Sequence, residues 1–385
     1  MRPLTIAIVS ATSFSPLDVS EMRETLPNEF FRFVMGTGRL SRAAETKNQK
    51  AIVDQIHDII VRDGDPTREI EAAVSFVSNA EWDPKLHHTV LHWAVLHRED
   101  AILAFLIKHV PGIDVNARDK FLKSTPLHLA ATSGDVNAIK LLLGVEGIDV
   151  NPRDAFGMTP LSWAVASKGK HAVEILLKAP GIDVNSCDAD DQTPLYTAVK
   201  VGCLDIIVSL LSADGINVNP RTNDQSTPLH KAVIDGRDDI VELLLHAHGI
   251  DLNARDNMQR TPLHWAAIKG NDRIVQLLLI DLGVMVNALD TWNKTALDYA
   301  TSQGFSRTVV LLMSTPGVDS TTCDDDRETP PELAEANRGW PDVPSPLDTP
   351  WGIDIEYKQD PMIQGIRQLA DSQVRRSTQP PNHDP

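Results

Sequence analysis

The sequence predicts an all-α protein in which short helix-turn-helix units stack side by side into a repeat solenoid. The first observation is a Thr-Pro-Leu motif, or a close variant, that recurs with one spacing of 36 residues and five of 34. The motif begins at Thr89, Thr125, Thr159, Thr193, Thr227, Thr261 and Thr295. A fixed period of this length is typical of repeat architectures, in which each unit covers the apolar face of its neighbour.

A second marker, Gly-Ile-Asp-Val-Asn or a variant of it, keeps the same period. Its glycines are separated by one step of 35 residues and five steps of 34. They are Gly112, Gly147, Gly181, Gly215, Gly249, Gly283 and Gly317. Two different markers with one period indicate about seven repeats between residues 81 and 320.

The first helix of each unit is predicted from stretches such as Arg260–Gly270, which reads RTPLHWAAIKG. Thr261 is expected to cap the helix N-terminus, and Pro262 suits the first helical position. Gly270 suits the left-handed backbone that ends such a helix. Arg98 and Lys168 stand in two other repeats where this glycine is expected.

The second helix of the same unit is predicted over 273–280, a stretch dominated by Leu, Ile and Val. Gly283 then turns the chain outward, and Val286-Asn287 opens an extended finger that leads to the next Thr-Pro motif. One such unit cannot cover its own apolar faces, whereas stacked units can.

These motifs resemble those of the ankyrin-repeat family. The matching stretches are TPLHLA at 125–130, TPLHKA at 227–232 and TPLHWAA at 261–267, with the weaker TVLHWA at 89–94 and TALDYA at 295–300. The resemblance covers residues 81–320 and implies paired antiparallel helices, projecting β-turn fingers and an elongated, curved stack. The family period is usually 33 residues, and we expect the added residue to lengthen a loop.

The segments on either side of the array are predicted to be less regular. Residues 1–45 form a poorly defined leader and 46–80 a degenerate helical cap, while 321–340 begin a truncated terminal repeat. Residues 341–385 are predicted to be an acidic, proline-rich, disordered tail. The apolar run Leu4–Val9 is short for a secretory signal. We therefore expect no signal peptide and a location inside the cell, in the cytoplasm or nucleus.

Composition excludes several classes of function. The net charge of −17 disfavours nucleic-acid binding, and no stretch of 18 consecutive apolar residues suggests a membrane span. Three cysteines cannot build a disulfide framework or a four-ligand zinc site. No phosphate-binding loop, nucleophile elbow or kinase signature is present. We therefore expect no catalytic residues, no cofactor and no metal, and the family resemblance implies a structural role for His128, His230 and His264.

Two series of residues vary while the scaffold repeats, and both are candidates for contact with a partner. The first lies at the finger tips, where apolar side chains are not needed for folding; it comprises Phe121, Phe156, Met258 and Trp292. The second follows the histidine position of the motif and comprises Trp93, Trp163, Trp265 and Tyr299. Aromatic side chains often anchor interfaces, but packing between repeats is the stronger explanation of the second series.

The leading hypothesis is a non-catalytic scaffold that mediates protein–protein interaction through its finger tips and concave helix face, with one or more proteins as partners. An alternative rests on Leu26-Pro27-Asn28-Glu29, which is similar to the opening of F-box segments. That resemblance implies a substrate receptor of a ubiquitin ligase, with residues 24–50 docking the ligase adaptor. A further alternative is an accessory protein in a biosynthetic or signalling pathway.

Overall fold

The threonines of the repeat begin helices, as their spacing predicts. Each has an extended backbone directly before the first helical residue, and proline follows in five of these seven helices. The Thr159 hydroxyl accepts a hydrogen bond from the Ser162 backbone N–H. Such a cap contributes about 1 kcal/mol of helix stability.

The computed structural model describes residues 89–110, 112–280 and 283–320. The predicted leader, helical cap, truncated repeat and tail, and the Leu26–Glu29 motif, lie outside the described residues. The chain divides into two compact units, Met1–Ala189 and Asp190–Pro385.

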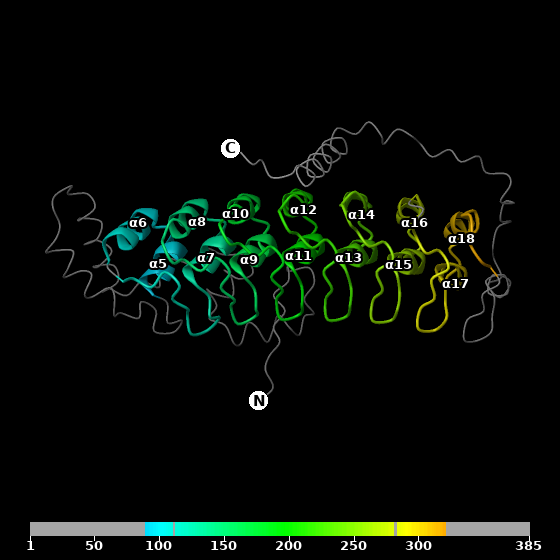
Figure 1. Cartoon of the computed structure of the whole chain (residues 1–385), viewed down its shortest axis with the longest axis horizontal. Helices are drawn as coiled ribbons and strands as arrows, with labels where there is room; N and C mark the ends of the chain where they lie inside the picture. The colour runs from blue at the N-terminus through cyan, green and yellow to red at the C-terminus, as the bar shows by residue number, and fades with distance from the viewer. Residues whose placement is uncertain (1–88, 111, 281–282, 321–385) are drawn as a thin grey trace, which may run out of the picture. The chain divides into compact units, whose positions relative to one another are not determined.

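The described residues of the first unit form three pairs of helices (Figure 1). They are α5 (Val90–His97), α6 (Asp100–His109), α7 (Pro126–Ser133), α8 (Val136–Leu143), α9 (Pro160–Ala166) and α10 (Lys170–Leu176). Helices α5, α7 and α9 pack in sequence as an inner layer, and α6, α8 and α10 pack as an outer layer. The fingers extend from the inner layer, on the side away from the outer helices.

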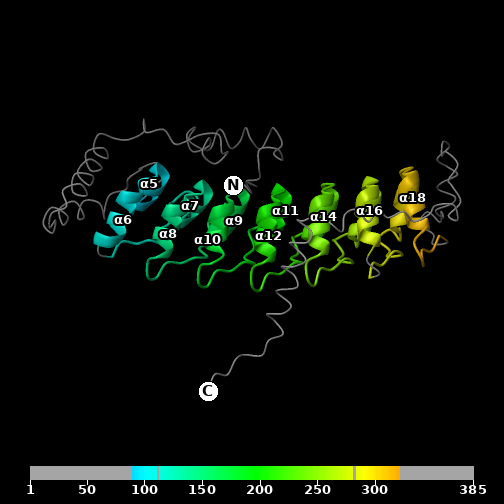
Figure 2. The ribbon, with the colours of Figure 1, turned by 90° about the horizontal axis from the view of Figure 1, so that it is seen from above.

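In the part of the second unit that the structure describes, this plan is repeated with four pairs. They are α11 (Pro194–Val201), α12 (Leu204–Leu211), α13 (Pro228–Ile234), α14 (Asp238–Leu245), α15 (Pro262–Lys269), α16 (Asp272–Leu279), α17 (Ala296–Ser302) and α18 (Ser306–Met313). The outer helices α14, α16 and α18 run nearly parallel to one another (Figure 2). The predicted solenoid of helix pairs is confirmed within each unit.

Helix α16 begins one residue earlier than predicted, at Asp272, and ends at Leu279. The reason is Asn271, whose side-chain oxygen accepts a hydrogen bond from the Ile274 backbone N–H at 3.2 Å. This cap starts the helix before the apolar residues on which the prediction relied.

The end of the first helix in a pair requires a left-handed backbone. Gly270 has φ 61°, and Arg98 and Lys168 adopt the same conformation at φ 57° and 60°. The expectation that these two side chains replace glycine is therefore confirmed. Each is a strained position, since a left-handed backbone disfavours any side chain.

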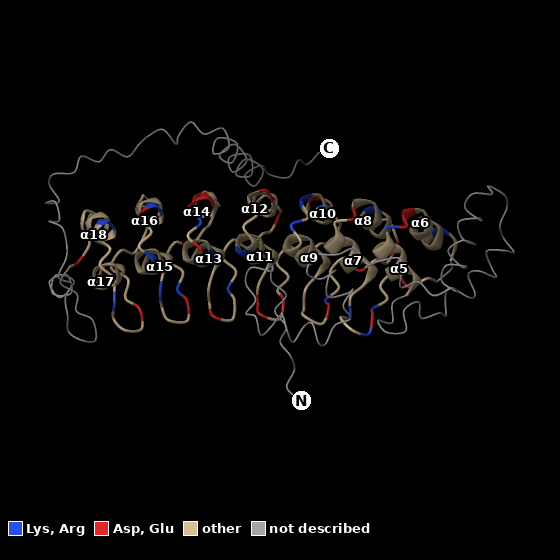
Figure 3. Ribbon diagram, turned by 180° about the vertical axis from the view of Figure 1, so that it is seen from behind, with Lys and Arg blue, Asp and Glu red and all other residues tan. Residues whose placement is uncertain are grey.

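The core of each unit consists of leucines and small residues between the two helix layers. The leucine of the Thr-Pro-Leu motif is at most 2% exposed in every repeat. These residues are Leu91, Leu127, Leu161, Leu195, Leu229, Leu263 and Leu297. Most charged residues lie on the outer helices and the fingers (Figure 3). The inner helices α5, α7 and α9 carry none, whereas α11, α13, α15 and α17 carry one each. No helix in the described part of the chain has the length and apolarity that a membrane crossing needs.

Candidate functional site

Most fingers are closed at the base by a buried side-chain acceptor, commonly an aspartate. Asp154 Oδ1 accepts hydrogen bonds from the backbone N–H groups of Phe156 and Met158, both at 2.9 Å. Asp256 does the same for the N–H groups of Met258 and Arg260. Because the carboxylate satisfies these donors, the turn does not depend on the side chain at its tip. The tip residue is therefore available for another role.

Neighbouring fingers within a unit are joined by hydrogen bonds. The Thr291 N–H donates to the Met258 carbonyl at 3.1 Å, and Arg255 Nη1 donates to the Leu289 carbonyl at 2.7 Å. Asn253 Nδ2 donates to the Gly283 carbonyl at 2.7 Å. The arginines at the finger bases thus fasten one finger to the next.

The finger tips expose apolar side chains. Phe121 is 45% exposed, Met258 40% and Trp292 41%, whereas Phe156 is half-buried. The exposure expected at three of the four predicted tip residues is therefore present. Contact of these residues with a partner remains a prediction.

Two further exposed residues of the same kind escaped the sequence analysis. Met285 and Leu289 lie on the finger between α16 and α17 and are exposed. They stand where the preceding finger carries Asp251 and Arg255. Aligning successive fingers residue by residue would have found them, because two charged positions become apolar together.

The inner-helix series divides into buried and half-exposed members. Trp93 and Trp163 are only 6% exposed, while Trp265 and Tyr299 are half-buried. Trp163 Nε1 donates to Asp154 Oδ2 at 2.7 Å, and burial raises the pKa of that carboxyl to about 6. Trp93 and Trp163 are thus mainly packing residues of the core. Trp265 and Tyr299 are partly exposed and form part of the protein surface.

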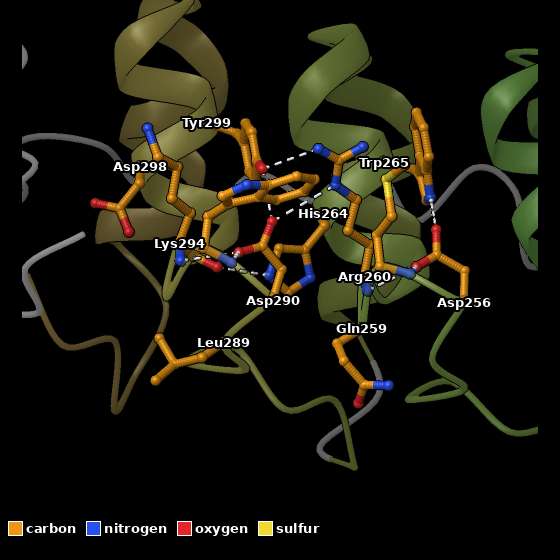
Figure 4. Close-up of polar contacts among 12 residues, drawn as sticks. Asp256, Gln259, Arg260, His264, Trp265, Leu289, Asp290, Lys294, Asp298 and Tyr299 are labelled. Atoms are coloured by element: carbon orange, nitrogen blue, oxygen red, sulfur yellow. Dashed lines mark hydrogen bonds and ion pairs between the residues drawn. The ribbon is translucent and has the colours of Figure 1, made fainter. Parts of the chain in front are cut away.

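Arg260 lies at the centre of that surface (Figure 4). Its guanidinium carbon is 5.0 Å from the Trp265 ring centroid, 4.9 Å from that of Trp292 and 5.1 Å from that of Tyr299. Arg260 Nη2 donates to the Tyr299 hydroxyl at 3.0 Å, and Nε lies 3.5 Å from Asp290 Oδ2. Three aromatic rings and one carboxylate therefore hold a single cation.

Asp256 and Asp290 support this arrangement from below. Trp265 Nε1 donates to Asp256 Oδ2 at 2.9 Å, and the Tyr299 hydroxyl donates to Asp290 Oδ2 at 2.6 Å. Burial and the contact with Asp290 raise the pKa of Tyr299 to about 12, so the hydroxyl keeps its proton at neutral pH. The side chains of Trp265 and Tyr299 are thereby fixed to the bases of two adjacent fingers.

The motif histidines are structural. His128 Nδ1 accepts from the Thr125 N–H at 3.0 Å, and Nε2 donates to the Met158 carbonyl of the next repeat at 3.1 Å. Burial lowers the pKa of His128 to about 4 and lowers the pKa of His92 and His230 in the same direction. These rings are therefore neutral at physiological pH. Within the described residues, no group of three or more His, Cys, Asp or Glu side chains could hold a metal ion.

Two family models match the chain. One, described as ankyrin repeats (3 copies), matches residues 91–188 and 172–256. The other, described as ankyrin repeats (many copies), matches residues 256–300.

Curated relatives match over a shorter stretch. Ankyrin repeat and SOCS box protein 6 from Mus musculus is 28% identical over 163 residues, 41% of this chain and 38% of the relative. Its counterpart from Homo sapiens is 38% identical over 78 residues, 20% of this chain and 18% of the relative. The chain thus spans well under half the length of these relatives.

Among solved structures, the ankyrin repeat domain of Bcl-3, described as a unique member of the IkappaB protein family, superposes with a TM-score of 0.51. The two share 28% sequence identity. The match covers 56% of this chain and 99% of that domain.

Proposed function

Because the chain belongs to the ankyrin-repeat family, we propose that it is a non-catalytic scaffold that binds another protein through its finger tips and the half-exposed part of its inner helices. The observation that carries the proposal is the exposure of Phe121, Met258 and Trp292 on turns whose backbone does not need them. Exposed apolar groups on a folded surface commonly mark interaction sites.

The inner-helix residues enter this proposal unequally. Trp265 and Tyr299 are only half-buried and lie beside Arg260, so both are expected to touch the partner. Trp93 and Trp163 are too deeply buried to offer much contact area and are expected to support the surface. Aromatic residues of the accessible kind dominate the free energy of many interfaces.

The test is affinity purification of the full chain from its native cells, followed by mass spectrometry. The variant Phe121→Ser/Met258→Ser/Trp292→Ser is expected to lose partners that the wild-type chain retains. Met313→Ser is the matched control, because Met313 on α18 is 43% exposed but lies away from the fingers. Partners retained equally by both variants would refute the assignment of binding to the tips.

A second candidate function is that of a substrate receptor of a ubiquitin ligase. Two observations favour it: the Leu26–Glu29 motif in the N-terminal segment, and relatives whose name joins ankyrin repeats to a SOCS box. In this proposal the repeats bind the substrate and a flanking segment binds the ligase adaptor. An adaptor that co-purifies with the full chain and is lost on deletion of residues 1–50 would support it; recovery of no adaptor would exclude it.

A further inference from the structure

Exposed apolar residues are concentrated on two adjacent fingers of the second unit. Met258 lies on the finger between α14 and α15, and Met285, Leu289 and Trp292 lie on the next. The backbone hydrogen bond from Thr291 to the Met258 carbonyl holds the two tips side by side. They therefore present one apolar edge rather than separate side chains.

Arg260 lies directly beside this edge, since its guanidinium contacts the ring of Trp292. Stacking against three rings and the contacts with Tyr299 and Asp290 fix its side chain in one orientation. An arginine fixed in this way loses little conformational entropy when it binds a ligand.

One edge of the guanidinium remains open. Nη1 hydrogen-bonds to none of the described residues, and it does not belong to the buried polar atoms, whereas Nε does. The side chain as a whole is 15% exposed. The Nη1–Nη2 edge has the geometry to donate two parallel hydrogen bonds to a carboxylate.

We propose that Arg260, Trp265, Trp292, Tyr299 and Met258, here called the Arg260 surface, bind a partner segment that places a carboxylate beside an apolar side chain. The carboxylate contacts the outward edge of Arg260, and the apolar side chain packs on Met258 and Trp292. The inference rests on the proposed scaffold function and specifies its site and the chemistry of the partner.

Charge favours this occupant over two others. A phosphate carries more negative charge than a carboxylate, and the buried Asp256 and Asp290 together with the net charge of −17 repel it more strongly. A basic side chain would have to displace the guanidinium that already lies among the three rings. A single carboxylate next to apolar groups is repelled less than a phosphate, because it carries less charge, and it leaves the guanidinium in place among the three rings.

The test is selection of displayed random 12-residue peptides on the full chain. Enriched peptides are expected to carry Asp or Glu within two residues of an aromatic or aliphatic residue. Their Kd should rise at least tenfold with Arg260→Met, and by a similar factor when the peptide Glu is changed to Gln. The two changes combined should cost little more than either alone, because both remove the same contact.

Arg307→Met is the matched control, since Arg307 on α18 is exposed and meets Asp272 only at 3.6 Å. Arg260→Lys keeps the charge but not the paired hydrogen bonds, so it should restore little of the affinity. Thermal melting shows whether each variant folds. The Glu→Gln peptide, measured on the wild-type chain, tests the contact even where Arg260→Met does not fold.

Several outcomes would overturn the inference. Enrichment of basic peptides, enrichment without acidic residues, or recovery of no binding peptide would each do so. A peptide Kd that is unchanged by Arg260→Met would also overturn the inference. That result would not contradict the proposed scaffold function. The proposed function of binding through the finger tips fails separately, when the tip variant retains every cellular partner of the wild-type chain.

Discussion

Two tryptophan–aspartate pairs, one in each unit, are built alike and differ in their surroundings. Trp163 donates to Asp154, and Trp265 donates to Asp256, from the same positions of the repeat. The residue before the helix cap is the buried Met158 in the first pair. In the second it is Arg260, whose charge remains in contact with water.

The exposure of the two rings follows this difference. Trp163 is 6% exposed and belongs to the core, whereas Trp265 is half-buried and stacks on a guanidinium. The same position in the repeat is therefore part of the core in one unit and partly accessible, beside Arg260, in the other. The two repeats thus differ in the surface they present although their fold is the same.

If the two units share one core design, truncation of equivalent leucines should destabilise both by similar amounts. Leu176 and Leu278 occupy the same repeat position and are at most 1% exposed. Leu176→Ala and Leu278→Ala should each lower the free energy of unfolding by about 2–5 kcal/mol, because both leave a cavity. Urea unfolding of the full chain measures the loss, and a neutral result at either site would contradict the shared core.

The buried carboxylate of the first pair predicts a dependence on pH. Its pKa rises from 3.8 to about 6 on folding because burial disfavours the charge. The protonated form is thus favoured in the folded state, and the stability it contributes is full below pH 4 and lost as pH rises to about 6. A shift of this size corresponds to about 3 kcal/mol.

Asp154→Asn removes this titration and is the reference for the measurement. The unfolding free energy of the wild-type chain, relative to that of the variant, should fall between pH 4 and 6 and stay constant above. Trp163 fluorescence should change over the same range, since its indole N–H contacts the carboxyl. A relative stability that grows with pH would contradict the assignment.

The ends of the inner helices share one backbone conformation but differ in the residue that adopts it. Lys168 and Gly270 occupy equivalent left-handed positions. Gly270→Ala should cost about 2–3 kcal/mol, because it combines the backbone penalty with a contact of 2.6 Å between the new Cβ and the Phe305 ring. Lys168→Gly should instead stabilise the chain by about 0.5–1 kcal/mol, since it relieves that penalty.

Thermal or urea unfolding of both variants checks these opposite signs. Gly134→Ala is a useful control, because a Cβ at Gly134 meets nothing within 4 Å and only the backbone penalty remains. Equal losses for Gly134→Ala and Gly270→Ala would show that the Phe305 ring moves aside at no cost.

The sequence predicted the scaffold well because each helix end depends on residues close in the chain. The threonine caps and the left-handed ends at Arg98 and Lys168 follow from local hydrogen bonding and backbone geometry. Repetition then fixed the packing, since a unit that fits its neighbour once fits it each time.

The arrangement around Arg260 was not predictable in the same way. Its partners Trp265, Trp292 and Tyr299 lie five, 32 and 39 residues later in the chain. Their meeting depends on side-chain orientations across two repeats, which no local pattern specifies. The sequence offered only separate candidates for partner contact: Trp292 at a finger tip, and Trp265 and Tyr299 on inner helices.

The smallest expected effects concern the tips, and they separate recognition from stability. Phe121→Ser should change the free energy of unfolding by no more than about 0.5 kcal/mol, because the Phe121 side chain is exposed. Trp292→Ser should cost about 0.5–1 kcal/mol, since it removes the ring stacked on the Arg260 guanidinium. Urea unfolding of the two single variants resolves this difference. A loss above about 1 kcal/mol for Phe121→Ser would mean that its ring supports the finger, and the expected difference in stability between the two tips would not hold.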